Sequence, residues 1–496
     1  MRMIKKHRFP LIALGIFTTY LISLPSAHSG PVYQSPGPNQ TYGNVSHSQR
    51  IAAGSGNPAS PAADQSRGGE FAKTSGMLAI GAGVEYGAIN NIFDLFNKTS
   101  ESIEPSPPGE GGDDQPDEPS DGINMDEILD DIIGNNPEIE EAVNQITKQA
   151  ITLGSALALI ATEGYGKAFV TADAPFTLKT RVYGGTFSFD INVSATSKIA
   201  GLTDTLDFDK DLLRSQLQAA AQLADDAGAT DFELNGDMTL TVDPSNNKVR
   251  LNFQNDSLLI TKAATIQEYA VGYSHPVGEF ENGQLFLGVK PKYIRAGLTR
   301  VGVRFGDITD SEELFEEIKN AEFAYDDEFS MDLGAMWVSD YYQVGGSLTN
   351  INEPSFAFPK LDLSNFNNQE IIHLAEKGRV YEMERQIKLE AGFHTVDRKW
   401  TINTALDVNS VADPMGDDYQ WASISTGYAT KSWWVPGARV GLHSNLAGTE
   451  LTYLSAGVTL FKYVDIDVSS TLDTVEIDDK NLPRGLNFSI GVAASF

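Results

Sequence analysis

Apolar and polar residues alternate along most of the chain after residue 167. In residues 329–337, for example, Phe329, Met331 and Leu333 alternate with Ser330 and Asp332. A two-residue period sends side chains to opposite faces of a β-strand. The same period recurs in residues 187–194, 285–293, 387–394, 400–409 and 464–468.

The number and length of these segments predict a fold dominated by β-strands. About 12 to 16 segments are recognisable, with fourteen favoured, and many have the roughly ten residues of a membrane-spanning strand. A β-sandwich also alternates, but it seldom needs so many strands of this length. We therefore predict an antiparallel transmembrane β-barrel over residues 167–496, with helical inserts in its loops at 209–226, 310–325 and 367–385.

The last segment carries the most specific signal for a barrel. Its apolar side chains occupy every second position and include the final aromatic residue: Leu486, Phe488, Ile490, Val492, Ala494 and Phe496. Small or polar residues fill the other face, so one face suits lipid and the other a lumen. The segment resembles the C-terminal strand that the barrel-insertion machinery of Gram-negative outer membranes reads. The alternative is an edge strand of a soluble exported protein, which would need covering against aggregation.

The first 29 residues predict export. Arg2, Lys5, Lys6 and Arg8 form a basic start, residues 11–24 are apolar, and residues 27–29 supply small residues for cleavage. This layout is typical of a cleaved signal peptide. An uncleaved anchor would need about 20 apolar residues, more than this run provides. With the barrel, the signal peptide predicts a location in the bacterial outer membrane.

Three further segments precede the predicted barrel. Residues 30–100 predict a hatch-like region, in which residues 77–96 form a short element with Glu85 and Asp94 exposed. Residues 101–141 contain 15 acidic residues and no lysine or arginine, so we predict a disordered acidic loop. A calcium loop of the EF-hand type is disfavoured because Pro119 stands where an oxygen ligand is needed. Residues 142–166 predict a helical segment.

Charge and cysteine content exclude several classes of function. The chain has no cysteine, which excludes disulfides, thiol catalysis and cysteine-bound metal. Its 36 basic and 67 acidic residues give a net charge of −31, and without residues 1–29, which hold four basic residues, 32 − 67 = −35. Such a charge repels phosphate backbones, so no nucleic-acid partner is expected.

The chain shows no recognisable enzymatic motif. HExxH, GxSxG and Walker A patterns are all missing from the sequence. His394 or His443, with Asp407 or Ser444, would be the candidates for a barrel hydrolase, but lumen or loop positions are the favoured interpretation. We therefore expect no enzymatic activity, cofactor or bound metal.

Two short motifs resemble parts of FadL-like outer-membrane barrels. Residues 50–62 (RIAAGSGNPASPA) resemble their Gly-rich N-terminal stretch, and residues 346–358 resemble a strand end carried by Asn350, Pro354 and Phe356. With the acidic-helical insert and the terminal phenylalanine, the chain is most similar to exported barrel proteins called conjugal transfer protein TraF. These differ from the thioredoxin-like TraF, which the lack of cysteine excludes.

The resemblance implies an N-terminal hatch that fills the lumen and holds Asn57, Pro58 and Ala59. It also implies passage of hydrophobic molecules from outside the cell. The acidic loop departs from a compact hatch, so the route and the substrate stay open.

Two functions remain as alternatives. One is transport of small or hydrophobic molecules, or an envelope function linked to conjugal transfer. The other is a structural component of a conjugation or surface apparatus without an open pore; a soluble exported binding protein is a third, less favoured option. Expected partners are outer-membrane lipid, the barrel-insertion machinery, and hydrophobic small molecules or conjugation proteins. We predict an acidic lumen lining, which would prefer cations if a channel is open. The predicted lumen charges are Asp190, Lys290, Lys292, Glu390, Asp407, Asp465 and Asp467.

Overall fold

The computed structural model describes twelve parts of the chain: residues 34–46, 56–68, 73–87, 164–204, 210–220, 230–235, 238–243, 248–253, 255–305, 320–430, 432–477 and 480–495. The predicted signal peptide, the acidic loop, residues 142–163 of the predicted helical segment and Phe496 lie outside these residues.

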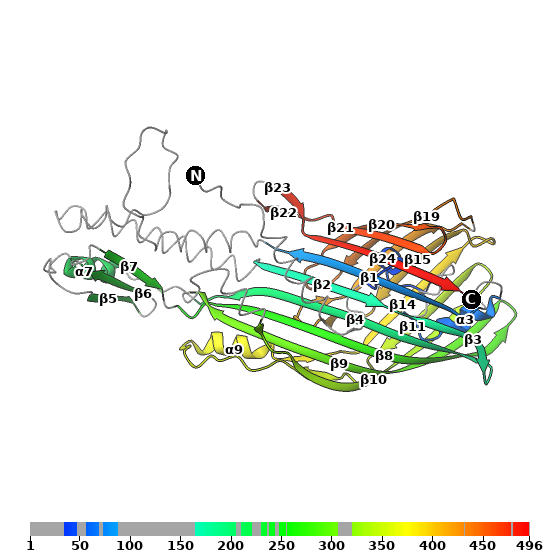
Figure 1. Ribbon diagram of the computed structural model, residues 1–496, viewed down its shortest axis with the longest axis horizontal. Helices are drawn as coiled ribbons and strands as arrows, with labels where there is room; N and C mark the ends of the chain where they lie inside the picture. Colours follow the sequence, from blue (N-terminus) through cyan, green and yellow to red (C-terminus); the bar gives the residue numbers. More distant parts are fainter. Residues whose placement is uncertain are drawn as a thin grey trace.

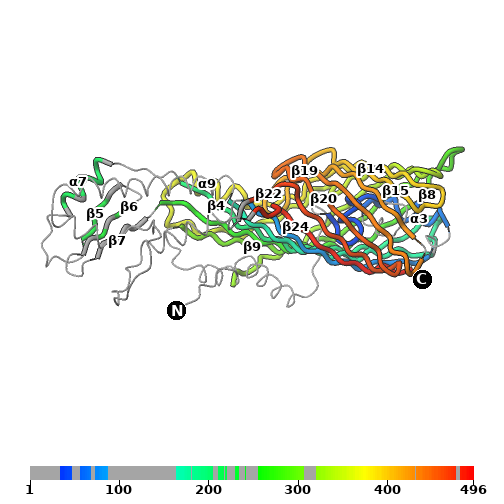
Figure 2. Tube along the Cα trace, turned by 90° about the horizontal axis from the view of Figure 1, so that it is seen from above, coloured from blue at the N-terminus to red at the C-terminus, as the bar shows by residue number. Residues whose placement is uncertain are grey.

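The described strands form a closed antiparallel β-barrel (Figures 1 and 2). β2 and β3 both pair with β1 and β4, so they occupy one position, and fifteen strands make a barrel of fourteen. This confirms the predicted fold class. The barrel strands are β1 (Ser75–Tyr86), β2 (Tyr165–Asp173), β3 (Phe176–Val182), β4 (Gly185–Leu202), β8 (Leu258–Phe280), β9 (Gly283–Arg304), β10 (Ala324–Val338), β11 (Tyr342–Thr349), β14 (Gln386–His394), β15 (Trp400–Asp407), β18 (Trp421–Tyr428), β19 (Gly437–Asn445), β20 (Thr452–Leu460), β21 (Val464–Thr471) and β24 (Gly485–Ser495).

The last strand closes the barrel against the first. β24 pairs with β21 on one side and with β1 on the other, each in an antiparallel register. Its large apolar side chains point outward, and Phe488 is 51% exposed, whereas Ser489 and Gly491 are buried inside. Ala494 is half-buried. Because both edges of β24 are paired, no free edge remains at this strand.

The outer and inner faces of the wall differ in polarity as the alternation predicts. On β10, Phe329 and Leu333 are exposed and Ser330 and Asp332 are buried. The apolar outer face suits contact with acyl chains, which offer no hydrogen-bond partners.

The barrel begins earlier in the chain than the sequence indicates. β1 lies within the region that the sequence predicts as a hatch, and β2 begins at Tyr165, within the predicted helical segment. Glu85 is only 3% exposed, so its expected exposure is wrong. Its side chain points into the barrel because Glu85 occupies an inward position of β1.

The two ends of the barrel have different connections. Residues 183–184, 281–282 and 461–463 make short turns at one end. Long connections at the other end hold the smaller elements: α7 (Lys210–Ala220), β5 (Thr230–Asn235), β6 (Met238–Asp243), β7 (Lys248–Phe253), β12 (Ser355–Ala357), α9 (Gln369–Lys377), β13 (Val380–Glu382), β16 (Val411–Ala412), β17 (Asp418–Tyr419), β22 (Thr474–Ile477) and β23 (Lys480–Pro483). Short turns on one side and long loops on the other are typical of outer-membrane barrels.

Two of the three predicted helical inserts contain a described helix. α7 lies in residues 209–226 and α9 in residues 367–385. α9 begins where the side chain of Asn368 accepts hydrogen bonds from the backbone of Glu370 and Ile371, a helix N-cap. The third insert lies largely outside the described residues, and its last part, from Ala324, belongs to β10.

Two short N-terminal helices lie inside the barrel. α2 (Pro38–Tyr42) contacts β18, β19, β20 and β21, and α3 (Ser60–Ser66) contacts β4, β8, β9 and β10. Figure 1 shows α3 at the barrel end where the C-terminus lies. None of the described helices has the length and apolarity needed to cross a bilayer.

Candidate functional site

The interior of the barrel is occupied by residues 34–46 and 56–68, which we call the plug. On the α2 side, Gln40 Nε2 donates to Ser469 Oγ at 2.9 Å and to the Asn487 carbonyl at 3.1 Å. The Gly37 amide donates to Ser489 Oγ at 3.0 Å. Polar inward positions of the wall strands therefore hold this part of the plug.

Glu390 joins the two parts of the plug. Its carboxylate accepts from the Ser46 amide at 2.6 Å and from Asn57 Nδ2 at 2.8 Å. Asn57 Oδ1 accepts from the Ala59 amide at 3.0 Å, a local turn that leads into α3. The predicted hatch residues Asn57, Pro58 and Ala59 thus lie in the plug, and all three are buried.

Inward-facing glycines of the wall make room for the plug. A Cβ at Gly288 would collide with the Pro58 carbonyl, and one at Gly334 would collide with the Asn57 side chain. On the opposite wall, a Cβ at Gly441 would collide with the Thr41 carbonyl. A strand interior normally disfavours glycine, and close approach of another backbone is one reason to keep it. Glycines at inward strand positions are visible in the sequence and are the signal that could have located these contacts.

Three of the predicted lumen residues, Asp190, Lys290 and Lys292, belong to one buried ion-pair group. Lys290 Nζ lies 3.4 Å from Asp190 Oδ2, and Lys292 Nζ lies 3.0 Å from Asp332 Oδ1 and 3.6 Å from Glu268 Oε2. All five side chains are buried. Because these charges are neighbours across β4, β8, β9 and β10, the carboxylates face ammonium groups at close range.

Asp465 and Asp467 form a second such group with Arg439. Arg439 Nε donates to Asp467 Oδ1 at 2.7 Å, and Arg439 Nη1 donates to Asp465 Oδ1 at 3.2 Å. The hydroxyl of Thr41 in α2 also donates to Asp467, at 2.5 Å. This ion-pair group therefore holds the plug as well as the wall.

The remaining predicted lumen residue, Asp407, binds the wall itself. Its Oδ2 accepts from Gln386 Nε2 at 3.1 Å and from the Trp421 amide at 2.9 Å. Lys388 Nζ lies 3.8 Å from Asp407 Oδ1. All seven predicted residues thus lie on the inner face. Two of them are lysines, and four of the five carboxylates have a lysine or arginine beside them. Glu390 is held by the plug, so the described interior is not a uniformly acidic lining.

The interior is apolar near the end with the long connections. A buried cluster there joins wall residues to residues of the loops: Ala264, Ile266, Ile294, Ala296, Leu298, Phe356, Phe358, Tyr381, Met383 and Met415. Phe356 is among the wholly buried large side chains, so the two-stranded β12–β13 sheet packs into this cluster. The polar plug and this apolar cluster divide the interior between them.

The loop that carries β16 and β17 is fixed to the wall by charge. Lys167 on β2 pairs with Asp413 and Asp417, and Lys198 on β4 pairs with Asp417. Burial alone would raise the pKa of Asp417, but the two ammonium groups lower the pKa to about 2. The carboxylate is therefore ionised whenever the loop is docked at neutral pH.

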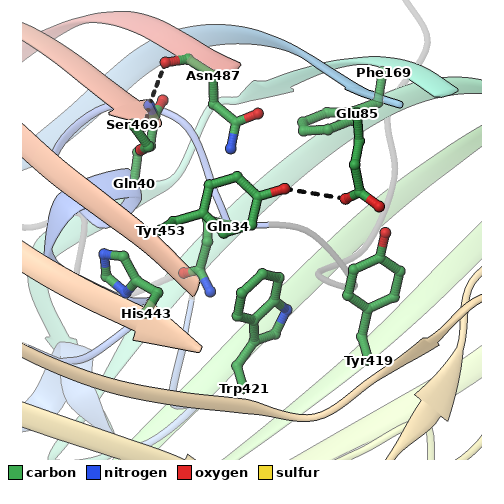
Figure 3. Close-up of a pocket in the computed structure, with 10 residues that line it drawn as sticks. All are labelled: Gln34, Gln40, Glu85, Phe169, Tyr419, Trp421, His443, Tyr453, Ser469 and Asn487. Atoms are coloured by element: carbon green, nitrogen blue, oxygen red, sulfur yellow. Dashed lines mark hydrogen bonds between the residues drawn. The ribbon is translucent and has the colours of Figure 1, made fainter. Parts of the chain in front are cut away.

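A cavity of about 20 Å³ lies between α2 and the wall (Figure 3), with room for one or two water molecules. Four aromatic side chains line it: Phe169, Tyr419, Trp421 and Tyr453. Figure 3 shows the Tyr453 hydroxyl directed at Glu85, whose Oε2 accepts from it at 3.0 Å. Gln34, Gln40, His443, Ser469 and Asn487 complete the lining.

The residues considered for hydrolysis do not form a catalytic site. His443 and Ser444 are successive residues of β19, so their side chains point to opposite faces. His394 Nδ1 lies 3.1 Å from the neighbouring Thr395 carbonyl, and Asp407 binds Gln386 and the Trp421 amide. Across the described ranges, no three His, Asp or Glu side chains come together as a metal site would require.

Comparison with known families identifies the chain. Residues 55–407 match the family model described as "F plasmid transfer operon, TraF, protein". The chain belongs to this family. The match covers the second part of the plug (residues 56–68), β1 and the wall as far as β15, and it confirms the TraF resemblance that the sequence indicates.

Several solved structures are similar to this TraF family member at low sequence identity. A mutant of the monoaromatic hydrocarbon channel TodX is 9% identical, with a TM-score of 0.42, and the likeness covers 95% of this chain and 99% of that one. A FadL homologue from Pseudomonas aeruginosa is 11% identical, with a TM-score of 0.33 and coverage of 95% and 100%. A mutant porin of Rh. blastica is 10% identical, with a TM-score of 0.24 and coverage of 66% and 91%. No curated protein matches the chain.

Proposed function

We propose that this TraF family member is a non-enzymatic outer-membrane barrel that admits small, mainly hydrophobic molecules by a gated route. Support for the membrane location comes from the closed barrel, its apolar outer face and the predicted signal peptide. N-terminal sequencing of the protein from purified envelopes tests the expected removal of residues 1–29. An intact Met1 in that material would contradict it.

The division of the interior carries this proposal. An apolar cluster at the long-loop end suits hydrophobic solutes, whereas the plug below it is held by separate polar contacts. Neutral hydrogen bonds contribute about 0.5 to 1.5 kcal/mol each, and those to the Glu390 and Asp467 carboxylates about 1.5 to 3 kcal/mol, so displacing the plug means breaking several separate contacts. The plug and the apolar cluster occupy the described interior, so passage is expected to require movement of the plug or the loops.

Removal of the plug tests the gated route. A variant lacking residues 34–66 is expected to raise single-channel conductance in planar bilayers well above that of the full chain. It should also increase entry of a hydrophobic fluorescent dye into cells that carry it. An inert, correctly assembled variant, with no rise in either measurement, would refute gating by the plug.

A second candidate function is a component of a conjugation apparatus without an open pore. The observation that favours it is the family description, which names a plasmid transfer operon. Deleting residues 101–141 separates the two functions when mating efficiency and dye uptake are measured in the same strains. Loss of mating with unchanged uptake favours the apparatus, and the reverse result favours the gated route.

A further inference from the structure

The cavity beside α2 combines a buried carboxylate with aromatic walls. Its ten lining residues include Glu85 and no lysine or arginine. The Glu85 carboxylate accepts hydrogen bonds from the hydroxyls of Tyr165, at 2.7 Å, and Tyr453, at 3.0 Å. Both donors are neutral, so they leave the charge of a buried carboxylate without a counter-ion in direct contact.

The nearest basic side chains bind other groups. Lys167 lies directly opposite Glu85 in the β1–β2 ladder, but its ammonium donates to Asp413, to Asp417 and to the Tyr419 hydroxyl. Arg484 Nη2 donates to the Tyr165 hydroxyl at 3.2 Å. Within the described ranges, no lysine or arginine nitrogen forms an ion pair within 4.0 Å of the Glu85 carboxylate, and Lys167 pairs with Asp413 and Asp417 instead.

The cavity presents further hydrogen-bond acceptors. Gln34 Oε1 and Asn487 Oδ1 are buried, and neither finds a donor among the described residues. Both side chains line the cavity with Glu85. Three acceptor groups around one small space call for a guest that is rich in N–H donors.

The aromatic walls favour the same guest. Trp421 lies between Tyr419 and Tyr453, with ring centroids 5.7 Å and 6.0 Å away. The faces of such rings attract cations. This cluster already holds one, because Lys167 Nζ lies 4.7 Å from the centroid of the Tyr419 ring.

We propose that the cavity binds a small ammonium-type cation, with Glu85 as its counter-ion and Trp421 and Tyr453 as its walls. The volume of about 20 Å³ admits an ammonium or methylammonium group and excludes bulky quaternary ions. A divalent cation is disfavoured because calcium and magnesium take six or more oxygen ligands, and this cavity offers a single carboxylate. The site lies against the plug, but binding there does not depend on whether the barrel passes solutes.

Titration of the full-length protein in detergent tests the site. Methylammonium chloride is added at constant ionic strength, balanced with sodium chloride, and tryptophan fluorescence is recorded. We expect a saturable change that sodium alone does not produce. The variant Trp421→Phe should lose the change, because the other four tryptophans lie outside the cavity lining.

Two variants assign the binding to its residues. Glu85→Gln keeps the shape of the side chain and removes its charge, and it should weaken methylammonium binding about tenfold or more. Asn487→Leu removes one acceptor but keeps the backbone carbonyl that binds Gln40, and it should weaken binding about threefold to tenfold. It serves as the test if Glu85→Gln does not fold. Glu353→Gln, which removes an exposed carboxylate paired with Arg385, is the matched control and should bind as the original chain does.

Three results would overturn the proposal. They are a titration without saturation, equal saturation by sodium, and unchanged affinity in a folded Glu85→Gln or Asn487→Leu variant. Each result can be told apart from failure of the gated route. A barrel that transports nothing can still bind the cation, and a plug-deletion variant can conduct without binding it.

Discussion

At the scale of single residues, the inward and outward directions of side chains follow from the sequence, whereas their partners do not. The two-residue period places all seven predicted lumen residues on the inner face. Arg439 lies beside Asp465 and Asp467 only because β19 and β21 flank β20 in a particular register. Register between distant strands depends on the whole barrel, so a local pattern could not reveal this ion-pair group.

The glycines beneath the plug give a prediction at this scale. Gly288→Ala places a methyl group where the Pro58 carbonyl lies, so the plug or the wall must shift. Overpacking of this kind costs about 1 to 3 kcal/mol. We expect a lower thermal unfolding temperature and faster proteolysis within residues 34–68.

A glycine on β11, which β10 separates from β9, serves as the control. At Gly346, a Cβ would meet only Leu389 and the Lys388 carbonyl at ordinary contact distances of 3.5 and 3.6 Å. Gly346→Ala should therefore leave both measurements nearly unchanged. Equal effects of the two substitutions would argue against the close approach of plug and wall.

At the scale of elements, glycines also explain why β1 escapes prediction. The strand SGMLAIGAGVEY carries Gly81 and Gly83 at inward positions, and glycine lowers β-propensity. Gly83 is needed because a Cβ there would collide with Phe169 and Asn487. The contacts that require glycine come from β2 and β24, which are distant in the sequence. The sequence of β1 alone therefore shows only an isolated apolar stretch.

The β16–β17 loop gives a prediction of pH dependence. The pKa of Asp417 is about 2 when the loop is docked, below its ordinary value of 3.8. The contribution of its ion pairs to stability is therefore complete above pH 3.8 and is lost as the pH falls towards 2. We expect backbone amides of residues 413–419 to exchange hydrogen faster at pH 2.5 than at pH 5, after correction for intrinsic rates.

A substitution at the same position provides the comparison. Asp417→Asn removes the titrating group, so exchange in this loop should be faster at pH 5 and should change little on acidification. If the asparagine variant retained the full pH dependence of the original chain, another group would have to be responsible.

At the scale of the whole molecule, the sequence predicts the architecture well because lipid imposes one rule on every strand. Fourteen strand positions obey it, including β24 with its outward Leu486, Phe488, Ile490 and Val492. The plug does not follow the alternation of the strands, because its residues contact the polar inner face of the wall. Its presence was indicated only through the resemblance of residues 50–62, and its contacts required the structure.

The outer face of β24 gives the third prediction. Phe488→Arg places a charge on the face that we assign to lipid, at a cost of about 2 to 4 kcal/mol near the centre of a bilayer. We expect less folded barrel in membranes, measured as the fraction that keeps its compact gel mobility without heating. Val396→Arg, in the exposed turn after β14, should assemble normally. Normal assembly of Phe488→Arg would show that this face does not meet acyl chains.

The pairing of β1 with β24 also sets an order of events during biogenesis. Ser75 meets Ser495, a partner made some four hundred residues later, so the seam cannot form until synthesis of the wall is complete. Joining such distant segments has a large loop-closure entropy and makes folding slow. Until then, β1 and β21 each have an unpaired strand edge. Unpaired edges can pair with other chains, so the incomplete polypeptide is prone to aggregate. The chain is therefore expected to stay prone to aggregation until residues 485–495 have been added and can pair with β1.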